Sequence, residues 1–268
     1  MLKKILKYIK MYFMLVRYAA QVDFMYWSNF VISILVELFY QGAFFAFFAV
    51  IFTQTKTIAG WGPYEMIVLL GIDTLTSELL TGMVIVWNSR ELPNKIWNGE
   101  LDRILLKPIH PLFTLTLGRP YFPSFISAFV GFILITIGLN KLHISLSVLG
   151  IVGSMLFFIL GFIIVCCIIV NFSLLTFFFQ DTWTLPRIGE RIVYSFTSRP
   201  HNIFSGFTKF LFYFILPVVY VSSFSTRTLI SGIDFKYLVI VLLLAIGMMY
   251  FTNWLWTKAV RNYSSASS

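Results

Sequence analysis

Charged residues are scarce in this chain of 268 residues, since only 12% are Asp, Glu, Lys or Arg. A soluble protein has about twice that share. Hydrophobic residues make up 59% of the chain, 30 of them Phe, and the mean hydropathy is +0.86. A single globule of this size cannot bury so much apolar surface. The composition therefore excludes a soluble domain and predicts an all-α integral membrane protein that uses the lipid bilayer as its solvent.

Cysteine and histidine are also rare. The two cysteines, Cys166 and Cys167, are neighbours inside an apolar run, and we expect them to pack as small hydrophobic side chains. The three histidines, His110, His143 and His201, lie in three separate connections, without the spacing of a zinc or other metal site. The sequence thus predicts no metal site and no catalytic centre.

Two nucleotide and hydrolase motifs are absent. No Gly-Lys dipeptide occurs, so the phosphate-binding loop GxxxxGK[ST] cannot be present, and no GxSxG turn exists. We therefore expect that the chain is not an enzyme and holds no cofactor of its own.

Long apolar runs are what the sequence does contain. A helix needs about 20 mainly apolar residues to cross a bilayer. Six stretches meet this length, and together they form one domain over 23–268: 24–52, 64–87, 120–139, 146–179, 207–226 and 237–257. Residues 218–236 are less apolar and predict a short re-entrant element on the outer side.

The first 22 residues differ from the spans, because cations are spread along them. The cations are Lys3, Lys4, Lys7, Lys10 and Arg17. At 100° per residue they fall on one arc of a helix, and apolar residues fall on the opposite side. This pattern predicts an amphipathic helix over 1–22 that lies in the membrane interface.

The positions of the cations predict the topology, because cytoplasmic connections are enriched in Lys and Arg. With the N-terminus inside, sixteen of the 20 cations lie in 1–22, 88–119, 180–209 and 258–268, and four lie outside. We therefore expect a multi-pass protein of the cell membrane with both termini cytoplasmic. The net charge of +9 follows from this topology, so no nucleic-acid partner is expected.

Three acids fall inside predicted spans, where a charge is costly. They belong to polar stripes at helical spacing. The first span carries Asn29, Ser33, Glu37 and Gln41, and the second carries Asp73, Ser77 and Thr81, with Thr74 and Glu78 on an adjoining stripe. Either these stripes face a substrate pathway, or they join neighbouring spans by hydrogen bonds. The sequence leaves both interpretations open.

The cytoplasmic connection 88–119 contains a compact amphipathic insert. Pro93 can begin a short helix, Gly99 can end it in the left-handed conformation, and a second helix can follow before Pro108. The insert is either an ordinary connector or a piece that docks in a groove of a soluble partner. Its candidate docking residues are Ile96, Trp97, Gly99, Glu100, Leu101, Asp102, Arg103 and Leu105.

Three segments carry a resemblance to a known family. The run IWNGELDRILLKPIHPLF resembles the signature of ABC-2-type transporter permeases that carry a GELD…KP..P.F pattern. RPHNIFSGFTKFLFYFILPVVYV and the closing WTKAVRNYSSASS are similar to two further family segments, in the same order.

The resemblance implies a permease that has no motor of its own. Cytoplasmic ATP-binding-cassette subunits would bind ATP and Mg, and the insert would be the coupling helix that contacts them. A second permease chain, identical or homologous, would complete the assembly. The resemblance implies that this assembly exports an apolar or amphipathic substrate.

Two rival functions use the intramembrane acids Glu37, Asp73 and Glu78 instead. One is a membrane-embedded enzyme acting on lipids, and the other is a proton-coupled secondary transporter.

Overall fold

Helices make up almost all of the described chain in the computed structural model, and the described residues contain no β-strand. The structure describes residues 2–83, 90–118, 120–144, 146–179 and 184–263. Its longer helices are α1 (Leu2–Met25), α2 (Trp27–Gln54), α3 (Pro63–Leu80), α7 (Phe122–Leu142), α8 (Val148–Leu174), α9 (Thr184–Thr197) and α12 (Phe235–Asn262). Its shorter segments are α4 (Arg90–Trp97), α5 (Glu100–Leu105), α6 (Pro111–Leu117), η2 (Leu175–Phe177), η3 (His201–Ile203), α10 (Gly206–Phe210), η4 (Leu211–Ile215), η5 (Tyr220–Phe224) and α11 (Ser225–Ser231). The predicted all-α fold is confirmed.

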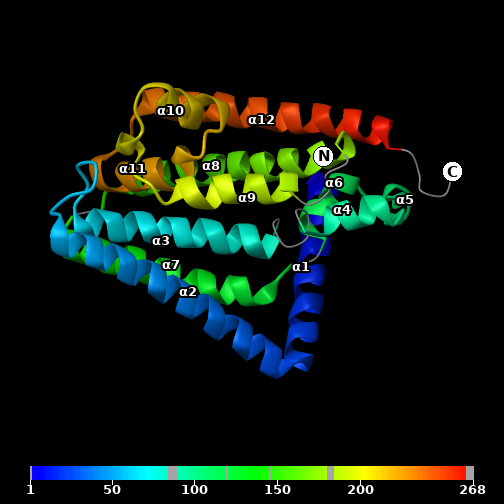
Figure 1. Ribbon diagram of the computed structural model, residues 1–268, viewed down its shortest axis with the longest axis horizontal. Coiled ribbons are helices and arrows are strands. Elements are labelled where there is room, and N and C mark those ends of the chain that lie inside the picture. Colours follow the sequence, from blue (N-terminus) through cyan, green and yellow to red (C-terminus); the bar gives the residue numbers. More distant parts are fainter. Residues whose placement is uncertain (1, 84–89, 119, 145, 180–183, 264–268) are drawn as a thin grey trace.

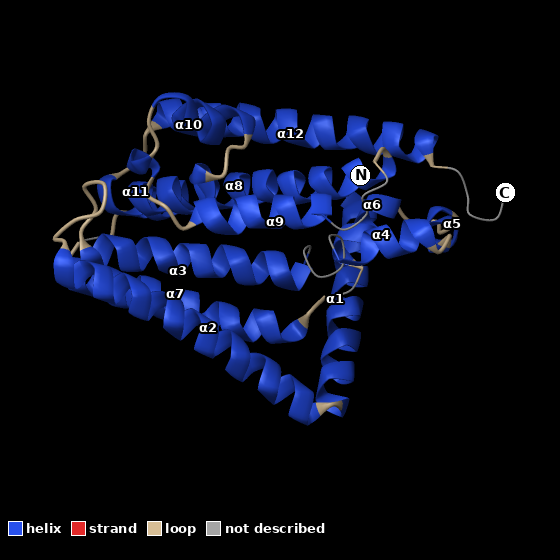
Figure 2. Ribbon diagram, viewed as in Figure 1, coloured by secondary structure: helices blue, strands red, loops and turns tan. Residues whose placement is uncertain are grey.

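The long helices α2, α3, α7, α8, α9 and α12 run along one common direction as a bundle (Figure 1). Helix α1 lies steeply across one end, where α4, α5 and α6 also gather, while α10 and α11 lie at the other end (Figure 2). We call these the insert end and the far end. Both ends of the described chain lie toward the insert end (Figure 1).

Within the described residues, five helices are long and apolar enough to cross a membrane, as expected for an integral membrane protein. They correspond to five of the predicted spans: Trp27–Gln54, Pro63–Met83, Phe122–Leu142, Val148–Phe177 and Phe235–Asn262. Residues 84–87 of the predicted second span lie outside the described residues.

The predicted fifth span, 207–226, is not one straight helix. Gly206–Ile215 and Tyr220–Ser231 meet at an angle of 82°, with Pro217 in the break between them. Proline has no N–H to continue a helix, and it disfavours the helical conformation of the residue before it. Leu216 accordingly has φ −121° and ψ 70°. The bend places a broken, re-entrant-like element at the far end, where the sequence predicted one over 218–236.

Helix α9 takes the place of that span. Helix α9 and the residues that follow α9 run antiparallel to α3, because later residues contact earlier ones. Tyr194 contacts Thr81, Thr197 contacts Asp73, and His201 contacts Trp61. The first contact is 2.6 Å between hydroxyl oxygens, and the last is 5.9 Å between ring centroids. The chain therefore travels along the whole of α3, from the insert end to the far end.

This path corrects the prediction that the connection 180–209 lies wholly on the side of the N-terminus. Arg199 and Lys209 follow α9 and lie at the far end, so the bias of cations falls from sixteen against four to fourteen against six. Hydropathy missed α9 because its fourteen residues include Arg187, Glu190 and Arg191. Its buried residues, among them Gly189 and Val193, pack in the bundle instead.

Helices α3 and α7 approach each other through glycine. A Cβ atom on Gly71 would lie 2.8 Å from the carbonyl oxygen of Gly131, and one on Gly131 would lie 2.6 Å from that of Gly71. Small residues of this kind let membrane helices pack backbone to backbone. Because α3 is the most buried of the five apolar helices, this contact fixes the centre of the bundle.

Cysteine labelling tests the path of α9. Asn202 and Lys56 are exposed at the far end and Asn94 is exposed at the insert end, while Cys166 and Cys167 lie inside α8. We expect a membrane-impermeant maleimide to label Asn202→Cys and Lys56→Cys from the same side of the membrane, and Asn94→Cys from the opposite side. Labelling of Asn202→Cys and Asn94→Cys from one side would contradict the path.

Substituting Gly131 by Ala tests the close contact of α3 and α7. The new methyl group must push backbone apart, so we expect a loss of about 1–3 kcal/mol of stability, measured as a lower midpoint of thermal unfolding in detergent. Gly247→Ala is the matched control, because nothing lies within 4 Å of a Cβ there. Equal midpoints for the two variants would show that the contact does not bear on stability.

Candidate functional site

The insert consists of two short helices joined by a tight turn. Gly99, with φ 68°, lies in the left-handed region between α4 and α5, as the sequence predicted. Pro93, which the sequence predicted to begin this helix, lies inside α4, whose described residues start at Arg90. The α4–α5 insert is therefore a defined corner at the end of the bundle.

One side of the insert belongs to the core of the bundle. Leu92 and Leu101 are fully buried and Ile104 is 6% exposed, all within the main hydrophobic cluster. Ile96 and Leu105 are partly buried against the same cluster. Leu101, Ile96 and Leu105, predicted to dock on a partner, therefore anchor the insert to its own chain instead.

The other side of the insert carries large exposed side chains. Trp97 is 77% exposed, Leu106 is 86% exposed, and the Arg103 side chain is 78% exposed. We call Trp97, Arg103 and Leu106 the outer face of the insert. Leu106 was not among the predicted docking residues, because helical spacing groups it with no other apolar residue of α5.

Ion pairs connect α4 and α5 at the corner between them. Lys95 Nζ lies 3.7 Å from a carboxylate oxygen of Glu91 and 3.5 Å from one of Glu100. Arg103 also reaches Glu100, at 3.8 Å. Lys95 is only 11% exposed, so its two contacts are partly shielded from solvent. Glu100 is thus a positioning residue that links α4 with α5.

Both ends of the chain contact the insert region. The Tyr8 hydroxyl of α1 accepts a hydrogen bond from the backbone N–H of His110 at 3.2 Å, and the Tyr8 and Phe113 rings lie 4.9 Å apart. Tyr263, just after α12, lies by Asp102; burial first, and then this carboxylate, raise the pKa of the Tyr263 hydroxyl. Helix α1 therefore contacts the residues that follow the insert, and Tyr263 at the end of α12 lies beside α5.

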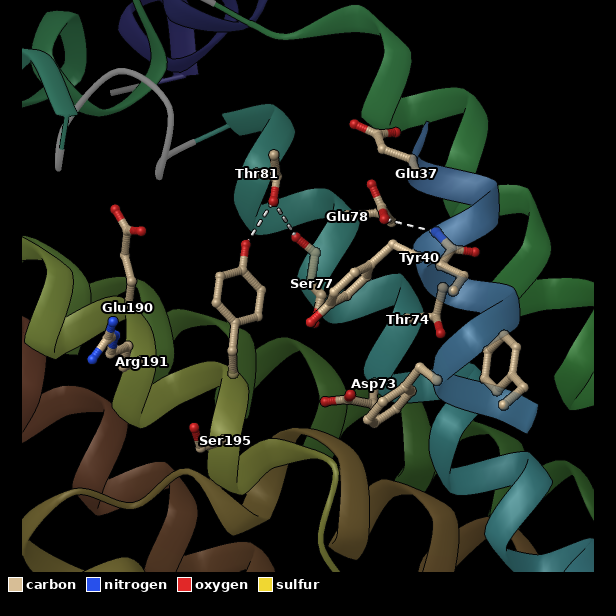
Figure 3. A pocket seen from close by; sticks show the side chains of 14 residues that line it. Glu37, Tyr40, Asp73, Thr74, Ser77, Glu78, Thr81, Glu190, Arg191 and Ser195 are labelled. Carbon is tan, nitrogen blue, oxygen red and sulfur yellow. Dashed lines mark hydrogen bonds between the residues drawn. The ribbon is translucent and has the colours of Figure 1, made fainter. Parts of the chain in front are cut away.

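The second candidate site is a cavity of about 530 Å³ between α2, α3 and α9. Figure 3 labels polar side chains from all three helices: Glu37 of α2, Asp73, Ser77 and Glu78 of α3, and Glu190 and Arg191 of α9. Gln41 of α2 and Tyr194 of α9 also line the cavity. Among the residues that the structure describes, no three His, Cys, Asp or Glu side chains form a group that could hold a metal ion.

Several of the intramembrane polar groups join helices to one another. Glu37 accepts hydrogen bonds from the hydroxyls of Ser127 at 2.6 Å and Ser124 at 3.3 Å, both on α7. The Gln41 side-chain amide donates to Glu78 at 2.8 Å, which links α2 with α3. For these residues the second interpretation, hydrogen bonds between spans, agrees with the geometry.

Asp73 is different, because one of its oxygens is buried without a hydrogen-bond partner. The residue is 7% exposed and its carboxyl group points into the cavity (Figure 3). Thr197 of α9 and Ser222 of η5 lie beside it, but the Thr197 hydroxyl donates to the carbonyl of Val193 and the Ser222 hydroxyl is itself without a partner. The cavity thus contains an unused acceptor that is aimed at its interior.

The structure brings five of the seven predicted pathway residues together and separates two. Glu37, Gln41, Asp73, Ser77 and Glu78 line the cavity. Asn29 is exposed and Ser33 lies near Tyr121, away from it. Sequence analysis missed the contribution of α9, because that helix was assigned to a cytoplasmic connection. Glu190 and Arg191 follow Arg187 by three and four residues, which is helical spacing. This pattern was the signal that could have identified the helix.

His201, in the segment RPHNIFSGFTKFLFYFILPVVYV, is buried at the far end. Its ring Nδ1 lies 2.9 Å from the Ser223 hydroxyl, which also accepts from its backbone N–H at 2.8 Å. Burial, aided by Arg227 and Lys209, lowers the pKa of His201 to about 4, so the ring is neutral at pH 7. A role in packing the far end follows.

Replacing Tyr263 by Phe tests the tie between the insert and α12. Removing the hydroxyl beside Asp102 should loosen α5, so we expect faster amide hydrogen exchange in Glu100–Leu105 with little change elsewhere. Tyr250→Phe is the control, because Tyr250 is 75% exposed on α12. Unchanged exchange in α5 would show that Tyr263 does not hold the insert.

Comparison with known proteins agrees with this architecture. The family model described as "ABC-2 family transporter protein" matches residues 38–267, which include both candidate sites apart from Glu37 and the α1 contact. No curated protein and no solved structure matches the chain. Because the matched region covers most of the chain, this multi-pass membrane protein belongs to the ABC-2 transporter family.

Proposed function

We propose that the chain is the membrane-spanning permease subunit of an ATP-binding-cassette exporter, driven by a separate ATPase through the α4–α5 insert. The observation that carries this proposal is the two-sided insert. Leu92, Leu101 and Ile104 fix it to the bundle, while Trp97 and Leu106 remain exposed at its outer face. Exposed large apolar side chains beside an arginine are typical of a protein-binding surface.

The partner that fits this face is a cytoplasmic ATP-binding-cassette subunit, which would bind ATP and Mg. A groove that receives Trp97 and an acidic group that pairs with Arg103 would suit the outer face. A second permease chain, identical or homologous, would complete the membrane part. In this proposal the insert end, α1 and both termini would lie on the cytoplasmic side of the cell membrane, with α1 in the membrane interface.

Movement of the insert would reach the membrane helices through the hydrophobic cluster that they share. Leu101 and Ile104 share one hydrophobic cluster with α8, η5 and α12 residues such as Val165, Val221 and Val241. Close packing of side chains in such a cluster transmits a displacement of the insert to the helices instead of absorbing it. Closure of an ATPase pair would therefore bias the bundle between inward-open and outward-open arrangements.

The cargo would be apolar or amphipathic. The cavity between α2, α3 and α9 combines carboxyl groups with Tyr40, Phe44 and Phe45 of α2. A ligand there would have an apolar part against the aromatic rings and a polar part against α3. The volume of the cavity, about 530 Å³, is within the range of small-molecule sites.

Substituting Trp97 by Asp tests the coupling role. Because the side chain is 77% exposed, we expect the variant to insert and fold normally. Loss of an aromatic anchor should lower substrate-stimulated ATPase activity of the purified complex by about tenfold or more. Leu106→Asp should act in the same direction, whereas Trp97→Phe keeps the apolar ring and should retain most of the activity.

The control is the abundance and thermal unfolding of the permease, which should equal those of the wild type in all three variants. Coupled ATPase activity that survives both Asp variants would overturn the assignment of this face to the ATPase.

A further inference from the structure

The cavity between α2, α3 and α9 has an excess of acidic groups. Four carboxyl groups line it, from Glu37, Asp73, Glu78 and Glu190, against one guanidinium group, from Arg191. Electrostatic interactions are stronger in a low-dielectric interior than in water. A wall with this composition favours a ligand of positive charge and disfavours an anion.

The cavity also contains buried acceptor atoms that accept no hydrogen bond, although the Thr197 and Ser222 hydroxyls lie beside Asp73. One carboxyl oxygen of Asp73 and the side-chain carbonyl oxygen of Gln41 are buried and have no partner, and each residue is 7% exposed. An acceptor buried without a hydrogen bond is costly. A ligand that brings N–H donors into the cavity would relieve this cost, and an ammonium group carries up to three of them.

Aromatic side chains form another part of the wall. Phe44 and Phe45 are partly buried, and both line the cavity from α2. Tyr40 is 74% exposed and also lines it, so the aromatic side continues to the surface of the bundle. Such rings accept an alkyl or aryl group and attract a nearby cation through their faces.

We propose that this cavity binds a cationic amphiphile, with a primary ammonium group at Asp73 and an apolar body along the aromatic side of α2. The inference rests on the proposed transport function and names its substrate class. Asp73 accepts from the ammonium group, Gln41 supplies a second acceptor, and Glu78 adds negative charge while it holds the Gln41 amide. Glu37 is occupied by the two α7 serines and contributes charge only.

Two dansyl probes of similar apolar size and opposite charge test the proposal. The full chain in lipid nanodiscs is titrated with dansylcadaverine, which ends in a primary ammonium, and with dansyl-aminohexanoic acid, which ends in a carboxylate; empty nanodiscs correct for partition into lipid. We expect saturable binding of the ammonium probe alone, and at least about tenfold weaker binding of it by Asp73→Asn. Glu78→Gln should weaken binding in the same direction.

Glu65→Gln is the control variant, because Glu65 lies at the far end, where it accepts from the Gly62 N–H, and does not line this cavity. Its binding of the ammonium probe should equal that of the wild type. Equal binding of both probes by the wild type would overturn the proposal without any variant. Binding of the ammonium probe that survives both Asp73→Asn and Glu78→Gln would overturn the assigned site.

The binding assay contains no ATPase and no ATP, so its outcome is separate from the coupling test at Trp97. Failure of probe binding with intact coupling would remove only the substrate class. Probe binding with no coupling through the outer face would remove the proposed function and leave the cavity.

Discussion

The burial of Leu92, Leu101 and Ile104 in the bundle core is the contact on which the other features depend. It turns a short polar connection into a rigid extension of the membrane helices, because buried side chains in a packed core cannot shift independently. The same burial decides which residues stay available on the other side. Trp97, Arg103 and Leu106 are exposed because the corner at Gly99 sets α5 against α4 with its apolar stripe inward.

Inside the bundle, polar groups divide between two roles. Glu37 and the Gln41–Glu78 pair bind neighbouring helices together, and so reduce the cost of placing acids among apolar spans. Asp73 lies opposite α9 with an oxygen left unused. On the same helix, Gly71 packs closely against Gly131 of α7.

Composition and hydropathy could predict the all-α membrane fold, five of the long helices and the turn at Gly99, because each depends on local sequence alone. They could not predict the path of α9. Arg187, Glu190 and Arg191 make that helix look soluble, and only the neighbouring α3 and the cavity give these side chains a polar place inside the bundle. Pro217 could be identified as an interruption of the fifth span, but the apolar residues around it gave no sign that the chain bends there by 82°.

The candidate docking residues show the same limit. Sequence spacing grouped Leu101 with Trp97 on one apolar side, yet tertiary packing buries the first and exposes the second. Asp73 and Glu78 could be found as acids in a span, but their different partners depend on which helix lies across from them. Such differences follow from contacts between distant segments, which periodicity does not contain.

Photo-crosslinking in native membranes tests the central claim most directly. With benzoylphenylalanine at position 97, the account predicts a light-dependent adduct with an ATP-binding subunit, and none with the same group at position 203 of the far end. An adduct at 203, or no adduct at 97 in a correctly inserted protein, would contradict the claim that this insert receives the drive for transport.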